Sequence, residues 1–167
     1  MADGYICRDG TGAMRLAFHG GGKGKTSAAL GIALRAAGHG LRVLYAGVMK
    51  TPYYQQEEVG EYKAMRRLGI HTLYLTDIGN PKLLYEYALE AADNYDVVIL
   101  DEVLYAVRQG FLRPADLVKI RGVEAHLVAT GNYWEPQLAE LFDLVTRVEA
   151  EKHYYEKGAV AVRGLDW

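Results

Sequence analysis

The sequence predicts an α/β domain built on a mostly parallel sheet with helices on both faces. Short apolar runs alternate with helical segments along nearly the whole chain, which is the pattern of strands linked by helical crossovers. A glycine-rich turn separates the first apolar run, 14–18, from an alanine-rich segment, 26–37. The run 96–100 is almost entirely aliphatic, as expected for a strand buried on both faces.

Each element follows from its spacing or from the residues that bound it. Gly38 and Gly40 end the first helix, and a proline at position 81 suits the first turn of a later one. The expected strands are 14–18, 41–46, 71–75, 96–100, 125–130 and 144–148. The expected helices are 26–37, 58–68, 81–94, 114–120 and 135–142. We expect an exposed loop at 47–58 and a polar, aromatic tail at 151–167 with a strand at 159–162.

Length and composition suit one domain preceded by a short arm. The 167 residues are half apolar, and we predict a flexible N-terminal arm at 1–13 and a single nucleotide-binding domain at 14–167. The formal net charge of −2 gives no reason to expect a nucleic-acid or membrane partner. No apolar run approaches the roughly 20 residues that a bilayer crossing needs. The single cysteine, Cys7, excludes an internal disulfide and fits a cytoplasmic location.

The glycine-rich turn carries the clearest chemical signal. It reads His-Gly-Gly-Gly-Lys-Gly-Lys-Thr-Ser and lies between a predicted strand and a predicted helix. Glycines let backbone N–H groups, led by those of Gly22 and Gly24, converge on anionic oxygens at the positive end of the helix. Lys25 adds a mobile cation, and the Thr26 hydroxyl suits Mg²⁺. The residues expected to bind the triphosphate of ATP are Gly20, Gly21, Gly22, Lys23, Gly24, Lys25, Thr26 and Ser27.

This motif makes the expected fold P-loop NTPase-like, although one position departs from the usual pattern. Glycine ordinarily stands before the Gly-Lys pair with four residues between them, and here that residue is His19. The alternative interpretation is a glycine turn that binds no ligand. The flanking strand and helix favour the phosphate loop.

Two carboxylates follow the most strand-like segment of the chain. Asp101 and Glu102 come directly after the run 96–100. Ligand sites in parallel sheets form beyond the carboxyl ends of the strands, so both acids are expected near the phosphate loop. With Thr26 they are the candidate Mg²⁺ ligands, directly or through water. The alternative is a pair of solvated loop acids.

Taken in order, several short motifs resemble those of the ATP:corrinoid adenosyltransferases. After Gly-Gly-Gly-Lys-Gly-Lys-Thr come Arg-Ala-Ala-Gly-His-Gly at 35–40, Leu-Asp-Glu at 100–102 and Ala-Thr-Gly at 129–131. Asp-Leu-Val-Thr at 143–146, Lys-His at 152–153 and Gly164 follow. The similarity runs from about residue 14 to the C-terminus, and the Arg-Ala-x-Gly-His-Gly segment after such a loop is fairly specific.

The resemblance implies transfer of the 5′-deoxyadenosyl group of ATP to a reduced cobalt(I) corrinoid, with release of triphosphate. It implies catalytic roles for Lys25, Thr26 and Glu102, with Asp101 beside them. It further implies ATP, Mg²⁺ and a corrinoid such as cobalamin as ligands, a homodimer, and a reductase that delivers the reduced corrinoid. No nucleic acid or membrane is implied.

Several positions depart from the family pattern and keep two other functions open. Of the usual motif after the second strand, only Lys50 remains in the stretch 47–51. Asn132 replaces an arginine, Arg147 replaces an acid, and Leu104 replaces a polar residue. The alternatives are a divergent ATPase or phosphotransferase, and a non-catalytic nucleotide-binding regulatory module.

Overall fold

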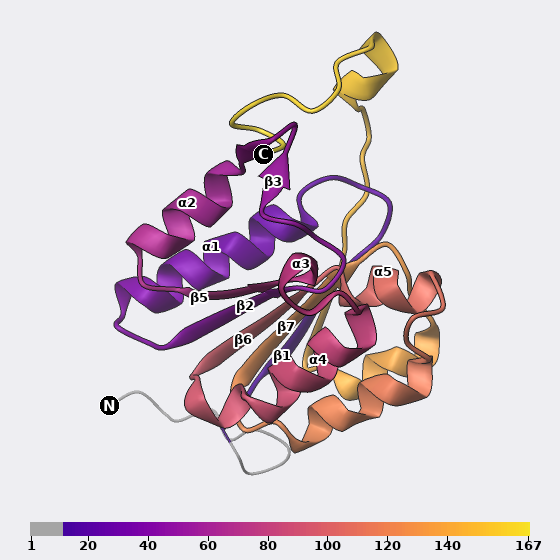
Figure 1. Ribbon diagram of the computed structural model, residues 1–167. Helices are drawn as coiled ribbons and strands as arrows, with labels where there is room; N and C mark the ends of the chain where they lie inside the picture. Colours follow the sequence, from indigo (N-terminus) through magenta and orange to yellow (C-terminus); the bar gives the residue numbers. More distant parts are fainter. Residues whose placement is uncertain (1–11) are drawn as a thin grey trace, which may run out of the picture.

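In a computed structural model, which describes residues 12–167, six strands form one sheet between two layers of helices (Figure 1). Every neighbouring pair of strands in this sheet is parallel, which confirms the predicted α/β class. In spatial order the strands are β5 (His71–Tyr74), β2 (Val43–Gly47), β6 (Val97–Asp101), β7 (His126–Gly131), β1 (Arg15–His19) and β8 (Leu144–Arg147).

Alternating side chains of the central strands feed two separate apolar cores. Val97 and Ile99 of β6 pack on one face, whereas Val98 and Leu100 pack on the other. Burial on both faces explains why this strand reads as a continuous aliphatic run. The first face is covered by α1 (Lys25–Gly38) and α2 (Gly60–Arg67). The second is covered by α4 (Pro81–Glu90), α5 (Val103–Arg108) and the 3₁₀ segments η2 (Pro114–Gly122) and η3 (Pro136–Leu141).

Strand order brings distant segments of the chain to one edge of the sheet. β1 and β2 are parallel, as predicted, but β6 and β7 lie between them. Helix α1 therefore crosses over two strands and packs on β6 and β7. The carboxyl ends of β1, β2, β6 and β7 consequently meet around the first turn of α1.

The segment 47–58 differs from the expected exposed loop. Val48 and Pro52 are buried, and β3 (Tyr53–Tyr54) pairs antiparallel with β4 (Glu57–Glu58). The turn between these strands holds Gln55 and Gln56 at φ 47° and 68°. Glutamine rarely adopts this left-handed conformation, so the sequence carries no turn signal.

Other elements were also predicted imperfectly. The segments 114–120 and 135–142 form 3₁₀ turns instead of α-helices, and the predicted helix 81–94 ends at Glu90 before the 3₁₀ turn η1 (Ala92–Asn94). The short helices α3 (Leu75–Ile78) and α5 were not expected. β8 forms as a strand, as predicted, and at the edge of the sheet it is largely exposed.

The C-terminal tail differs from the prediction. Residues 159–162 form no strand; the tail contains the 3₁₀ turn η4 (Tyr154–Lys157) and turns around 163–166. Residues 1–11 of the predicted arm lie outside the described residues. Within 12–167, every helix is too short or too polar to cross a membrane.

Candidate nucleotide-binding site

The loop between β1 and α1 is held in a shape that only glycine allows at two positions. Gly20 has φ 113°, and a Cβ there would lie 2.4 Å from the Val148 carbonyl oxygen. A Cβ on Gly22 would lie 2.6 Å from the backbone of Glu149. The backbone just beyond β8 thus contacts the loop directly, which explains why glycines stand at these positions.

Backbone bonds fix the loop to that segment. The Val148 N–H donates to the His19 carbonyl (2.7 Å), and the Gly22 N–H donates to the Val148 carbonyl (2.9 Å). The Lys25 ammonium donates to the Gly22 carbonyl at 2.6 Å. The Gly22 amide, expected to lead the phosphate contacts, is therefore engaged within the protein. Gly24, at φ 119°, is the N-cap of α1, and its side of the loop faces a cavity.

That cavity measures about 530 Å³ and opens at the N-terminus of α1. Lys23, Gly24, Lys25, Thr26 and Ser27 line it, together with Glu102. The structure thus gathers most of the sequence-predicted site residues around one space. The other walls are Leu30, Lys50, Gly60, Glu61 and the C-terminal residues Gly164, Leu165, Asp166 and Trp167.

Gly20 and Gly21 line a different hollow, of about 390 Å³, on the opposite flank of the loop. There the His19 imidazole stacks on Trp134, with ring centroids 4.3 Å apart and planes 14° apart. Burial lowers the pKa of His19, as do the positive charges of Arg147 and Lys25. His19 is therefore neutral at pH 7, and its ring takes the place that glycine usually has in such loops.

Asp101 is the buried centre of a hydrogen-bond network behind the cavity. Its carboxylate accepts from the Tyr45 hydroxyl (2.6 Å), the Thr130 hydroxyl (2.6 Å) and the Thr26 hydroxyl (3.1 Å). The Lys50 ammonium lies 3.0 Å from the same carboxylate. These donors compensate a fully buried charge, and they come from α1 and from β2, β7 and the segment just after β2.

Thr26 is oriented by its contacts on both sides. Its hydroxyl donates to Asp101 and accepts from the Lys50 ammonium at 2.9 Å. A hydroxyl oxygen has two lone pairs, so one acceptor position remains for a ligand. This arrangement holds the oxygen ready for a hard cation.

Of the two acids that follow β6, Glu102 is the one that lines the cavity. Its backbone has φ 62°, and its N–H donates to the Thr130 hydroxyl at 2.9 Å. Burial raises the pKa of Glu102, and the neighbouring Asp101 charge raises it further. Burial likewise lowers the pKa of Lys25, against the opposing effect of Glu102 and Asp101. Both shifts reflect charged groups held partly out of water beside one another.

Part of this network was missing from the sequence-based site. Tyr45, Lys50 and Thr130 were not predicted as site residues, although each stands at or near the carboxyl end of a strand beside β6. The strand-end rule could have found Thr130, and the family resemblance had already retained Lys50. The involvement of Gly164 to Trp167 had no local signal, because it depends on how the tail folds back.

The residues that depart from the family pattern lie near the loop or in the core. Asn132 and Arg147 both line the His19 hollow, and Arg147 forms an ion pair with Glu149. Leu104 is fully buried. A Cβ added to Gly131 would lie 2.8 Å from the Cβ of Leu104. A polar side chain at Leu104 would thus be enclosed by the close approach of α5 to the end of β7.

Among residues 12–167 there is no group of three or more His, Cys, Asp or Glu side chains placed to hold a metal. A cation at Thr26 and Glu102 would therefore complete its coordination with water or ligand oxygens. Mg²⁺ suits such a site, because it keeps several waters and binds through one or two protein oxygens plus phosphate.

Comparison with known proteins identifies the family of the chain. A sequence model of the family described as ATP:corrinoid adenosyltransferase BtuR/CobO/CobP matches residues 12–167. A corrinoid adenosyltransferase of Pseudomonas aeruginosa is 29% identical over 175 residues, covering 96% of this chain and 86% of the relative. One from Escherichia coli K12 is 27% identical, covering 91% of this chain and 84% of the relative. One from Salmonella typhimurium LT2 is 25% identical with the same coverage.

The fold and the loop at the start of α1 define an α/β protein with a polar cavity at the carboxyl edge of its sheet. Because the family model spans nearly the whole chain, this protein belongs to the ATP:corrinoid adenosyltransferase family.

Proposed function

We propose that this protein transfers the 5′-deoxyadenosyl group of ATP to the cobalt of a reduced corrinoid and releases triphosphate. The observation that carries the proposal is family membership over residues 12–167. The cavity beside the glycine loop, with cations and carboxylates on its walls, supports it. In the reaction the cobalt(I) electron pair forms the bond to C5′, and the C5′–O bond breaks toward the triphosphate.

We assign the triphosphate to the loop residues that border the cavity. Lys23, Gly24, Lys25, Thr26 and Ser27 present two ammonium groups and the N-terminus of α1 to this space. The leaving group carries the negative charge that develops as the C5′–O bond breaks. Cations and oriented amides placed around its oxygens would stabilise that charge without reorganisation. Gly20 and Gly22 would act by shaping the loop, and Gly21 lies on the other flank.

We assign Mg²⁺ to Thr26 and Glu102. When bound, Mg²⁺ supplies further neutralisation of the triphosphate. Asp101 would act from behind: its buried carboxylate fixes the Thr26 hydroxyl and holds Lys50 close to it. Asp101 and Glu102 would therefore not both bind the cation, because Glu102 lines the cavity and Asp101 does not.

An aromatic side chain borders the same space and suits exclusion of water from a strongly reducing centre. Trp167 lines the cavity, and the Tyr54 ring of the β3–β4 hairpin packs on Trp167 with ring centroids 5.2 Å apart. We further propose that the protein forms a homodimer, that a reductase delivers the reduced corrinoid to it, and that it is located in the cytoplasm. The exposed leucines Leu34 and Leu68 offer apolar surface for self-association. Light scattering would test the dimer.

The test is product analysis under strict reduction. Protein, MgATP and cob(I)alamin should yield adenosylcobalamin and inorganic triphosphate in equal amounts, and Lys25→Ala should lower the rate. Formation of ADP would instead indicate an ATPase or phosphotransferase. Binding of ATP without any product would indicate a regulatory module.

A further inference from the structure

The C-terminal residues form a wall of the cavity although they lie about 140 positions from the loop in the sequence. The tail leaves β8, passes the loop and returns beside the β3–β4 hairpin, where the chain ends (Figure 1). Gly164, Leu165, Asp166 and Trp167 line the cavity together with Lys23 to Ser27. A segment in this place contacts whatever occupies the cavity.

Asp166 ties the tail to the loop. Its carboxylate forms an ion pair with the Lys23 ammonium and accepts hydrogen bonds from the Tyr154 hydroxyl and, at 2.5 Å, from the Val162 N–H. These contacts lower the pKa of Asp166 to about 2, so the group is an anion at neutral pH. The carboxylate is mostly buried, whereas Lys23 remains partly exposed.

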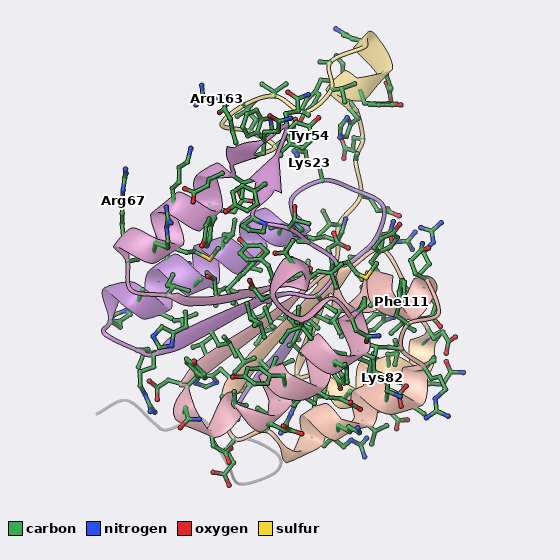
Figure 2. The ribbon with its side chains drawn as sticks, viewed as in Figure 1. Lys23, Tyr54, Arg67, Lys82, Phe111 and Arg163 are labelled. Carbon is green, nitrogen blue, oxygen red and sulfur yellow. The ribbon has the colours of Figure 1, made fainter. Side chains whose placement is uncertain are left out.

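A second set of contacts fastens the tail to the hairpin. The Trp167 indole N–H donates to the Ala161 carbonyl (2.9 Å), and its ring packs against Tyr54. Arg163 lies over the Trp167 ring and pairs with Glu57 of β4 at 3.3 Å. Figure 2 shows Lys23, Tyr54 and Arg163 close together at this end of the molecule. The hairpin contacts do not involve Asp166, so the two attachments can be separated by mutation.

With a triphosphate bound, Lys23 would divide its three N–H donors between two anions. A carboxylate and a phosphate oxygen are both charged acceptors for an ammonium group, and they repel each other at short range. Asp166 is already on Lys23, in the wall of the cavity to which the triphosphate is assigned. A triphosphate bound there would compete with Asp166 for the Lys23 ammonium.

We propose that Asp166 is a positioning residue, an internal anion that holds Lys23 and the C-terminal segment together until a triphosphate displaces it. The inference rests on the proposed function, because it takes the cavity beside Lys23 as the triphosphate site. Displacement frees residues 164–167 from the loop while Glu57 still holds Arg163. The tail therefore responds to whether the site is filled.

Calorimetric titration with MgATP and with inorganic triphosphate measures the competition. Asp166→Asn removes the competing charge and should tighten binding of both about five-fold, the factor expected for a partly exposed ion pair. Asp166→Glu keeps the charge and should bind like the unchanged protein. In a Lys23→Ala background, the effect of Asp166→Asn should fall below two-fold, because only direct repulsion between the carboxylate and the triphosphate remains.

A control variant separates competition from simple loosening of the tail. Glu57→Gln breaks the Arg163 attachment. It leaves the Lys23 contact in place, so it should change affinity less than two-fold. Tightening by Glu57→Gln equal to that by Asp166→Asn would overturn the proposal, as would weaker binding by Asp166→Asn.

Tail movement has its own readout, because the chain contains only two tryptophans. With Trp134→Phe, all tryptophan emission comes from Trp167. Triphosphate should shift this emission with the same midpoint as the calorimetric titration, and Lys23→Ala should abolish the shift. Calorimetric binding without a shift overturns this inference alone. If neither MgATP nor inorganic triphosphate binds, the proposed function and this inference are both overturned.

Discussion

Replacing Gly20 by alanine tests whether the backbone beyond β8 shapes the phosphate loop. The new Cβ would lie 2.4 Å from the Val148 carbonyl oxygen, whereas ordinary contact begins at 3.4 Å, so the backbone must move by about 1 Å. Overpacking of this kind costs about 1–3 kcal/mol. The φ of 113° adds roughly 1–3 kcal/mol for a residue with a side chain. We therefore expect Gly20→Ala to lower the free energy of unfolding by at least about 2 kcal/mol.

Gly21→Ala is a matched control at the next position. A Cβ there meets nothing within 4 Å, and Gly21 is not among the residues with positive φ. Its stability should stay within about 1 kcal/mol of the unchanged protein. Thermal unfolding without nucleotide, followed by circular dichroism, should show Gly20→Ala melting lower by at least about 4–8 °C. Equal melting temperatures for the two variants would refute the close approach of loop and strand.

Three further predictions concern charged groups. Lys25→Ala should weaken ATP binding by about one to two decades, because a charge-assisted hydrogen bond contributes roughly 1.5–3 kcal/mol; unchanged affinity by calorimetry would misplace the triphosphate. Glu102→Gln should weaken MgATP binding much more than binding of metal-free ATP, and equal losses in the same titrations would contradict the metal assignment. The Asp116 carboxyl, hydrogen-bonded by Arg113, has its pKa lowered from 3.8 to about 2, so its stabilising effect is complete above pH 4 and lost as the pH falls toward 2. Arg113→Ala should flatten the acid limb of stability against pH, measured by urea unfolding between pH 2 and 5, and an unaltered limb would argue against this pair.

The sequence predicted the sheet well because its strands carry strong local signals. Aliphatic runs such as 96–100 can be buried only inside a sheet covered on both faces, and this follows from composition alone. The glycine-rich motif likewise predicted the loop between the first strand and the first helix. The clustering of Lys23 to Ser27 with Glu102 then follows from the rule that parallel strands present their carboxyl ends to one edge.

What escaped prediction depends on contacts between distant segments. No local signal says that β6 and β7 stand between β1 and β2, or that β8 is an exposed edge. The hairpin was missed because Gln55 and Gln56 adopt positive φ without glycine or asparagine. The segment 159–162 has β-type residues but is bent by Ala161 at φ 52° and by the bond from the Val162 N–H to Asp166. Tertiary context overrides propensity in each case.

Two buried tyrosines show how the same side chain can have opposite effects on stability. The rings of Tyr45 and Tyr74 pack together with centroids 5.7 Å apart, and both are nearly inaccessible to solvent. The Tyr45 hydroxyl donates to the Asp101 carboxylate at 2.6 Å. The Tyr74 hydroxyl is the one buried side-chain polar atom within 12–167 that lacks a hydrogen-bond partner. Their substitutions by phenylalanine keep the ring packing and remove only the hydroxyl.

Tyr45→Phe should lower the free energy of unfolding by about 1.5–3 kcal/mol, because it removes a hydrogen bond to a buried charge. Tyr74→Phe should raise it by about 1 kcal/mol or more, because an unpaired hydroxyl no longer has to be removed from water on folding. Urea unfolding at pH 7 measures both. Since the two rings share one packing environment, a difference in sign can come only from the hydroxyl's partner. A loss of stability in Tyr74→Phe as large as that in Tyr45→Phe would mean that Tyr74 has a partner in solution.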